Sequence, residues 1–198
     1  MNYMRLSAPI MAIVYDDGQR IAPLMDRIVT YLRATGCQLA GLRQIAVSRP
    51  GQSRCDMILE DLASGATAAI SEDRGEGARG CRLDVDALLK AMARARDALD
   101  ERPDLLLVNK FGKTECEGGG LRPLIVSALE REVPVLVAVP RGNIDGWRAF
   151  AGELSVEHDL ADLPDDVARV VDLLGLEIER QGGEHRSHAL SGIEWPAA

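Results

Sequence analysis

Three stretches of the chain are apolar at almost every position, and they predict the architecture. They are residues 9–15 (PIMAIVY), Leu105–Val108 (LLLV) and residues 134–139 (PVLVAV). None of them shows the apolar–polar alternation of a strand with one solvated face. Continuous apolar runs of this length are typical of strands buried on both faces of a parallel sheet. The pattern therefore predicts a mostly parallel central sheet that carries helices on both sides.

Between these runs, apolar side chains recur at spacings of three and four residues, the period of an amphipathic helix. The spacing predicts helices over residues 21–35, 85–99, 121–132 and 165–174. Gly36 and Asp84 stand where a helix end and a helix N-cap are expected. A predicted strand over residues 37–47 follows the first helix. The chain therefore opens with the strand–helix–strand unit of a doubly wound α/β fold.

The sequence predicts one domain with an insertion. Two short strands at residues 55–62 and 66–71 flank a Ser-Gly turn and predict a β-hairpin. We expect residues 1–180 to form a single α/β domain, with the hairpin inserted at about residues 50–72. The polar, glycine-containing sequence at 181–198 predicts a flexible tail.

Composition restricts the partners. The 198 residues are 46% hydrophobic and 27% charged, with a formal net charge of −8. Such a chain lacks the basic footprint that binds nucleic acid or an anionic membrane. No apolar run approaches the roughly 20 residues of a membrane span, and the N-terminal apolar stretch ends in two aspartates, which favours a strand over a signal peptide. We therefore expect a cytoplasmic protein that binds neither nucleic acid nor membrane.

The four cysteines form no C-x-x-C pair and no zinc-finger spacing. In a cytoplasm their thiols are expected to be reduced. Cys55, Cys81 and Cys116 could form a metal or thiol site if the fold gathers them. The alternative is that they are small buried hydrophobic side chains or inert thiols. The sequence alone predicts no metal site.

The most polar stretch of the chain follows the apolar run at 105–108. It reads NKFGKTECEGGGLR over residues 109–122. In open α/β sheets, ligands bind beyond the carboxyl ends of the strands, so this stretch is the predicted ligand site. Its candidate ligand-binding residues are Asn109, Lys110, Gly112, Lys113 and Arg122, and its candidate catalytic residues are Glu115 and Glu117. The alternative is a solvated surface loop in which the glycines at 118–120 form a flexible turn.

The turn after the first strand, Asp16-Asp17-Gly18, lies at the same predicted edge. A P-loop needs several glycines, a lysine and a serine or threonine hydroxyl. This turn offers one glycine and no lysine, and its two carboxylates would repel phosphate unless a metal lay between. Two interpretations stay open, ordinary turn and helix-cap chemistry or ligand contacts by Asp16, Asp17 and Gly18.

A glycine-rich, charged segment at residues 72–82 contains Arg79 and Arg82. Its arginines and glycine amides could form an anion pocket. Its composition also fits a solvated loop.

Several segments resemble known families. VYDDG at residues 14–18, CDM at 55–57, RGCRLD at 79–84 and VNKFGKTECEGGGLRPLI at 108–125 resemble a bacterial family called domain of unknown function 2478. Residues 55–152 resemble the small P-loop nucleoside triphosphatases, whose Walker B strand ends in D-E-I-G-K where this chain has NKFGK. The resemblance implies a three-layer P-loop-NTPase-like sandwich. The bacterial family is often met beside molybdate-uptake genes, which implies a link to molybdenum metabolism.

The chain departs from these triphosphatases at the catalytic residues. The Walker A Gly-Lys-Thr is absent. Asn109 replaces the Walker B aspartate that would hold Mg²⁺, and Lys110 replaces the neighbouring acid. Phosphoryl transfer relies on these parts for positioning and charge neutralisation. The replacements imply a more cationic pocket, with Lys113, Arg79 and Arg82 nearby, and inefficient hydrolysis.

Two functions stay open. In the first, the chain is a degenerate P-loop-like domain without enzymatic activity that binds a nucleotide, an oxyanion such as molybdate, or a partner protein, with a homodimer as a further arrangement. In the second, it is a nucleoside triphosphatase or phosphate-ester enzyme with a rebuilt site. There the two lysines of the polar stretch would hold phosphate, Glu115 or Glu117 would act as base, and Asp16 and Asp17 would hold a metal. The cofactor would be Mg²⁺ or a bound nucleotide.

Overall fold

The computed structural model describes residues 9–47, 56–72 and 82–176. In chain order its elements are β1 (Ile10–Tyr15), α1 (Gly18–Ala34), β2 (Leu39–Val47), β3 (Asp56–Asp61), β4 (Thr67–Ala69), β5 (Ser71–Glu72), β6 (Arg82–Leu83), α2 (Val85–Asp97), η1 (Ala98–Glu101), β7 (Leu105–Val108), α3 (Lys113–Cys116), α4 (Arg122–Glu130), β8 (Val135–Pro140), η2 (Arg141–Asn143), α5 (Ile144–Ala151), η3 (Gly152–Leu154), β9 (Ser155–Asp159), η4 (Leu160–Asp162) and α6 (Val167–Asp172).

The main sheet has seven strands in the order β4-β3-β2-β7-β8-β1-β9. The strands from β2 to β9 in this order are parallel, whereas β3 and β4 run antiparallel at one edge. β5 and β6 form a separate two-stranded sheet. The mostly parallel sheet with an antiparallel hairpin at residues 56–69 confirms the predicted fold class.

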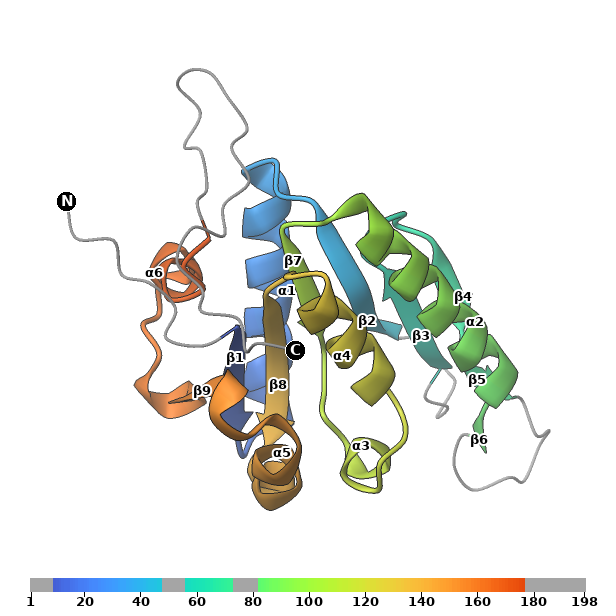
Figure 1. Ribbon diagram of the computed structural model, residues 1–198. Helices are drawn as coiled ribbons and strands as arrows, with labels where there is room; N and C mark the ends of the chain where they lie inside the picture. The colour runs from blue at the N-terminus through green and yellow to red at the C-terminus, as the bar shows by residue number, and fades with distance from the viewer. Residues whose placement is uncertain (1–8, 48–55, 73–81, 177–198) are drawn as a thin grey trace.

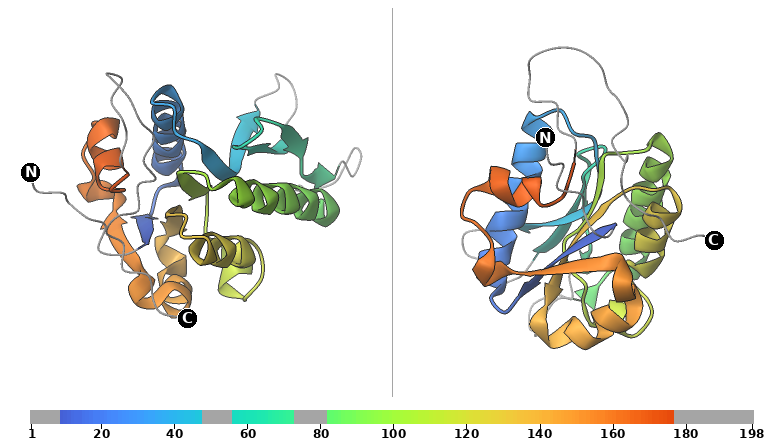
Figure 2. Two further views of the ribbon diagram at one scale, coloured as in Figure 1. Left: turned by 45° about the horizontal axis from the view of Figure 1, so that its top comes forward. Right: turned by 60° about the vertical axis from the view of Figure 1, so that its left-hand side comes forward.

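Helices cover both faces of this sheet, as Figures 1 and 2 show. α2, α4 and α5 pack on one face, and α1 and α6 pack on the other. The side chains of β7 alternate between the two layers. Leu106 and Val108 join the α2–α4 layer, whereas Leu105 and Leu107 join the α1 layer. All four are completely buried, as the apolar run predicts.

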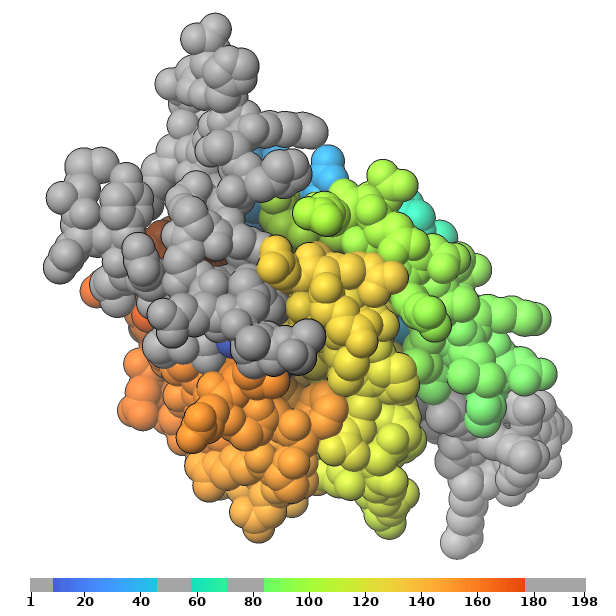
Figure 3. Space-filling model, in the orientation of Figure 1, coloured from blue at the N-terminus to red at the C-terminus, as the bar shows by residue number. Residues whose placement is uncertain are grey.

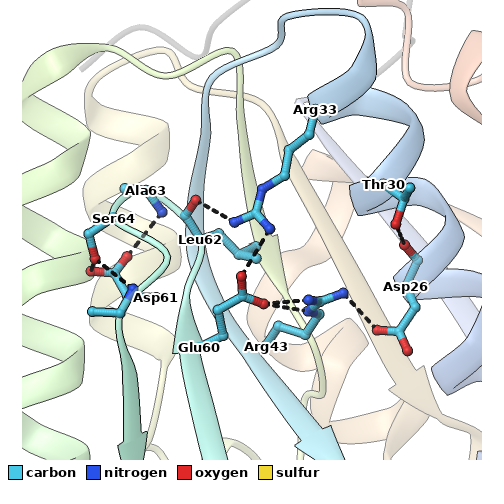
Figure 4. Close-up of polar contacts among 10 residues, drawn as sticks. Asp26, Thr30, Arg33, Arg43, Glu60, Asp61, Leu62, Ala63 and Ser64 are labelled. Atoms are coloured by element: carbon cyan, nitrogen blue, oxygen red, sulfur yellow. Dashed lines mark hydrogen bonds and ion pairs between the residues drawn. The ribbon is translucent and has the colours of Figure 1, made fainter.

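A polar network fastens the hairpin to α1 (Figure 4). Glu60 on β3 is 7% exposed and accepts hydrogen bonds from Arg33 of α1 at 2.9 Å and from Nε of Arg43 on β2 at 2.9 Å. Arg43 also pairs with Asp26 of α1 at 3.0 Å, and Arg33 donates to the carbonyl of Leu62 at 2.9 Å. Burial alone would raise the pKa of Glu60, but the two arginines outweigh that effect and lower it.

Two local details differ from the prediction. The strand predicted at 66–71 is divided into β4 and β5, because Ile70 between them is buried and its carbonyl accepts the N–H of Asp84 at 2.8 Å. The polar stretch after β7 contains a one-turn helix, α3, that the sequence pattern does not predict. Within the described ranges, no helix is both long and apolar enough to span a membrane.

Candidate functional site

β1 and β8 are neighbouring parallel strands, and the chain continues from them onto opposite faces of the sheet. Their last residues, Tyr15 and Pro140, are paired. The chain after β1 enters α1 on one face, and the chain after β8 enters α5 on the other. Such a switch point is where an open α/β sheet binds its ligand. The carboxyl edge around β1, β8 and β7 is therefore the candidate site.

The connection from β1 to α1 is only two residues long, Asp16 and Asp17. The carboxylate of Asp17 accepts the N–H of Gln19 at 2.7 Å and so caps α1. A P-loop wraps phosphate with a longer glycine-rich turn whose N–H groups remain free. Here the turn is short and acidic, and its cap uses one of the helix-start N–H groups.

Arg141, the first residue of η2, joins the ends of three strands. Its Nε donates to both carboxylate oxygens of Asp16, at 3.0 and 2.8 Å, and its Nη2 pairs with Asp159 at the end of β9. The hydrogen bonds that Arg141 donates to Asp16, and then those to Asp159, raise the pKa of Arg141. The N–H of Ala161 and then Arg141 lower the pKa of Asp159. Ion pairs therefore occupy the switch point.

The sequence analysis did not select Arg141. An arginine directly after a fully apolar strand is the available signal. Its acidic partners lie 125 and 18 residues away in the chain, so only the fold identifies them.

The loop after β7 is held against its neighbours by Phe111. The N–H of Phe111 donates to the carbonyl of Ala138 on β8 at 2.8 Å. Its ring is completely buried, edge-on to Trp147 at 5.0 Å and stacked on Phe150 at 5.8 Å between centroids. Asn143 of η2 donates to the carbonyl of Phe111 at 2.9 Å. These contacts fix the backbone between Lys110 and Lys113.

The two lysines of this loop point into solvent. Lys110 is exposed, and the structure gives it no ion pair with another described residue. The side chain of Lys113 is 87% exposed and lies 3.6 Å from Glu117, one turn later on α3. Asn109 and Gly112 are half-buried. The loop therefore presents two weakly compensated cations from a fixed backbone.

Glu115 supports this loop from inside. It is 8% exposed, and its two carboxylate oxygens accept the N–H of Gly112 at 2.7 Å and of Leu121 at 2.9 Å. Gly120 has φ +60°, and a Cβ there would lie 1.9 Å from Oε1 of Glu115. Glycine at position 120 is thus needed for the approach of the Glu115 carboxylate. Catalysis by Glu115 or by the exposed Glu117 stays a prediction.

Arg122 begins α4 at the end of the same loop. Its guanidinium carbon lies 4.3 Å from the ring centroid of Phe150, a cation–π contact. Cys116 is half-buried, and its sulfur lies 3.9 Å from the carbonyl of Asn143. A Cβ on Gly146 would meet that sulfur at 2.6 Å, so α3 and α5 pack closely here.

The structure divides the predicted residues into two groups. Lys110, Gly112, Lys113 and Arg122 belong to the loop after β7, whereas the acids of residues 16 and 17 lie beyond β8 and are engaged with Arg141 and Gln19. Arg79, Cys55 and Cys81 lie outside the described residues, and of Arg82 only the backbone, in β6, is described. Among described residues, no group of three or more His, Cys, Asp or Glu side chains could hold a metal ion.

The sheet order and the switch point beside β1 define an α/β protein with the P-loop-NTPase-like fold. The chain belongs to the family described as "Protein of unknown function (DUF2478)", whose model matches residues 10–168. This confirms the family predicted from the sequence.

Two known proteins are similar to this chain. It is 30% identical over 143 residues to the molybdenum import ATP-binding protein ModC 2 of Bradyrhizobium diazoefficiens strain USDA 110; the match covers 72% of this chain and 16% of that protein. The solution structure of a human cancer-related nucleoside triphosphatase superposes with a TM-score of 0.52 at 14% identity, covering 82% of this chain and 92% of that one. The second likeness concerns the fold.

Proposed function

We propose that this protein binds a small anion, a nucleotide or an oxyanion, at the loop after β7 and does not hydrolyse it efficiently. The observation that carries the proposal is the content of the switch point. A two-residue acidic turn and the Arg141 ion pairs stand where a P-loop would hold triphosphate. Phosphoryl transfer without the P-loop lysine and the Walker B acids loses its main sources of charge neutralisation.

The distribution of lysine supports the place of binding. The chain has 23 basic residues, of which only Lys90, Lys110 and Lys113 are lysines. Two of the three lie within four residues of each other, on a loop pinned by Phe111 and Glu115. A compact ammonium with three donors suits a phosphate or a tetrahedral oxyanion. A fixed backbone reduces the entropy lost when the anion binds.

The similarity to a molybdenum import protein supports molybdate as one of the anions to test. The match covers 16% of that protein. We propose a regulatory or accessory role for this chain beside an importer. We further propose a cytoplasmic protein that binds neither nucleic acid nor membrane, in keeping with its net charge of −8.

A thermal-unfolding series tests the proposal. The purified protein is heated with ATP, GTP, ADP, molybdate, tungstate, sulfate or phosphate, each with and without Mg²⁺. A ligand at a hundred times its dissociation constant stabilises a fold by about 2.7 kcal/mol. We expect at least one anion to raise the melting temperature, and we expect the Lys110→Ala/Lys113→Ala variant to lose that increase.

Lys90→Ala is the matched control, because Lys90 is the remaining lysine and lies on α2. It should retain the full increase. Failure of every anion to shift the melting temperature would overturn the proposal. Release of phosphate from a nucleotide with Mg²⁺ or Mn²⁺, abolished in Glu117→Gln, would favour the enzyme instead.

A further inference from the structure

Arg122 adds a guanidinium to the two ammonium groups of the loop after β7, and packing holds its side chain in place. Its guanidinium carbon lies 4.3 Å from the ring centroid of Phe150. That ring is stacked on the completely buried ring of Phe111, at 5.8 Å between centroids. A contact with a packed ring restricts the conformations of a long side chain, so less entropy is lost when a ligand binds. Arg122 is therefore a pre-oriented cation.

The hydrogen-bond donors of this side chain have no acceptor within the described part of the chain. A guanidinium carries five N–H donors, and no carboxylate or carbonyl of a described residue accepts one from Arg122. The other half-buried arginines of the described ranges differ in this respect. Arg43 donates to Glu60 and Arg131 donates to Asp100, each at 2.9 Å. An ordered arginine without such a partner is suited to bind the oxygens of an external anion.

Arg122 and Lys113 reach the loop at consecutive residues. Nη1 of Arg122 lies 3.5 Å from the position that a Cβ on Gly118 would take. Nζ of Lys113 lies 3.6 Å from a carboxylate oxygen of Glu117. Both cations therefore lie beside the carboxyl end of α3. Figures 1 and 3 show α3 at the lower end of the molecule, next to the α4 surface.

The exposed charges of this loop are mostly positive. Glu115 is buried and accepts two backbone N–H groups, whereas Glu117 is exposed. Lys110, Lys113 and Arg122 are thus three cations against one exposed carboxylate, which leaves two positive charges uncompensated. A multiply charged anion is the ligand that such a surface favours.

We propose that the anion bound at this loop carries two or more linked phosphate groups, one held by Arg122 and the next by Lys110 and Lys113. The inference rests on the anion binding proposed above and narrows its ligand. The guanidinium fork takes two oxygens of one phosphate, whereas a lysine ammonium acts as a point charge for another.

Glu117 explains why a single small oxyanion suits this loop less well. Its carboxylate pairs with Lys113, and the next residue in the chain lies against Arg122. A lone tetrahedral oxyanion placed between these two cations would be repelled by that carboxylate. Linked phosphates can place one group at each cation and so avoid that position. The same chemistry is offered by inorganic diphosphate and by a nucleoside diphosphate or triphosphate.

Isothermal titration calorimetry of the full chain at constant ionic strength tests the proposal. The titrants are phosphate, molybdate, diphosphate and ADP. We expect diphosphate and ADP to bind at least about tenfold more tightly than phosphate and molybdate, because a second charge-assisted contact forms. Tighter binding of ADP than of diphosphate would support a nucleotide as the ligand, and equal binding would support recognition of the linked phosphates alone.

Arg122→Lys isolates the contribution of the guanidinium. Lysine keeps the charge but has no fork and no comparable stacking, so the preference for diphosphate over phosphate should fall to near unity. Arg94→Lys is the matched control, since Arg94 is exposed in the last turn of α2, and it should keep the preference. Equal stability of both variants in urea unfolding would exclude a loss of fold as the cause.

Equal affinities for phosphate, molybdate and diphosphate, or a preference unchanged in Arg122→Lys, would overturn this inference. The proposed function would survive either result if the Lys110→Ala/Lys113→Ala variant still lost binding. Binding of none of the four anions would overturn both.

Discussion

Glu115, a candidate catalytic residue from the sequence, stabilises the backbone of the loop after β7. Its carboxylate holds the N–H groups at both ends of the polar loop, of Gly112 and Leu121. Hydrogen bonds to a charged group contribute about 1.5–3 kcal/mol each. Since both are lost together, we expect Glu115→Ala to lower the free energy of unfolding by about 2–4 kcal/mol. Urea unfolding followed by circular dichroism measures this, and a change below about 0.5 kcal/mol would contradict the assignment.

Gly120 offers a second test of the same contact. An alanine there would place its Cβ 1.9 Å from Oε1 of Glu115, at a φ of +60°. We expect Gly120→Ala to destabilise the protein by about 2–4 kcal/mol, from overpacking together with backbone strain. The matched control is Gly18→Ala, because Gly18 has nothing within 4 Å of its Cβ position. Equal stability of the two variants would show that the loop adapts to the added methyl group.

Glu115 and Gly120 can be read from the sequence, but the contact between them cannot. The polar stretch at residues 109–122 predicts a ligand site at the end of β7, and the structure places a loop with two exposed lysines there. The Glu115 carboxylate can lie beside residue 120 because that residue is glycine. The ion pairs of Arg141 are formed with Asp16 and Asp159, which lie at the ends of other strands. Such pairings follow from the three-dimensional course of the chain, and no local pattern encodes them.

At the scale of the elements, the acidic turn between β1 and α1 can be tested for its two interpretations, helix capping and ligand contact. Asp17 caps α1 by accepting the N–H of Gln19. Loss of an N-cap typically costs about 1 kcal/mol, so we expect Asp17→Ala to destabilise the protein by that amount. Asp17→Asn should retain most of the stability. In thermal unfolding, a loss of Mg²⁺-dependent ligand stabilisation in Asp17→Asn would instead indicate a metal-binding role.

The β3 hairpin is attached through Glu60, and this attachment should depend on pH. The pKa of Glu60 is lowered from its ordinary value of 4.5 by Arg33 and Arg43, against the effect of burial. A lowered pKa contributes stability that is complete above the ordinary value and is lost as the pH falls through the folded-state value. We expect Glu60→Gln to cost about 2–4 kcal/mol at pH 7. This difference from the unchanged protein should shrink progressively below about pH 4.5.

Urea unfolding between pH 7 and pH 3 measures this difference. Glu130→Gln serves as the control, since Glu130 is exposed on α4 and has no ion pair with another described residue. It should follow the unchanged protein at each pH. A difference for Glu60→Gln that stays constant with pH would show that ionisation of Glu60 does not stabilise the hairpin.

For the molecule as a whole, the layered arrangement of sheet and helices follows from features visible in the sequence. The apolar runs that became β1, β7 and β8 are buried on both faces, and the helices between them cover the two sides. Long periodic segments determine layers through burial alone, so they can be predicted. The attachment of the hairpin could not, because Arg33 and Arg43 lie 27 and 17 residues from Glu60.

In the whole molecule a P-loop-NTPase-like fold is combined with a ligand site that, as we propose, lies elsewhere than a P-loop would. The chain has the P-loop-NTPase-like sheet, but a helix cap and ion pairs fill the position beside β1. The exposed cations lie one strand beyond β8, at residues 110 and 113. The central claim is therefore that an anion binds at the loop after β7 and not at the β1–α1 turn.

A ¹H–¹⁵N NMR titration of the uniformly labelled protein tests that claim most directly. ATP and molybdate are added in separate series, and the backbone amide signals are followed by residue. The account predicts that saturating shifts concentrate at residues 109–114 and are absent from residues 16–20. Saturating shifts confined to residues 16–20, or no saturating shift with either anion, would contradict it.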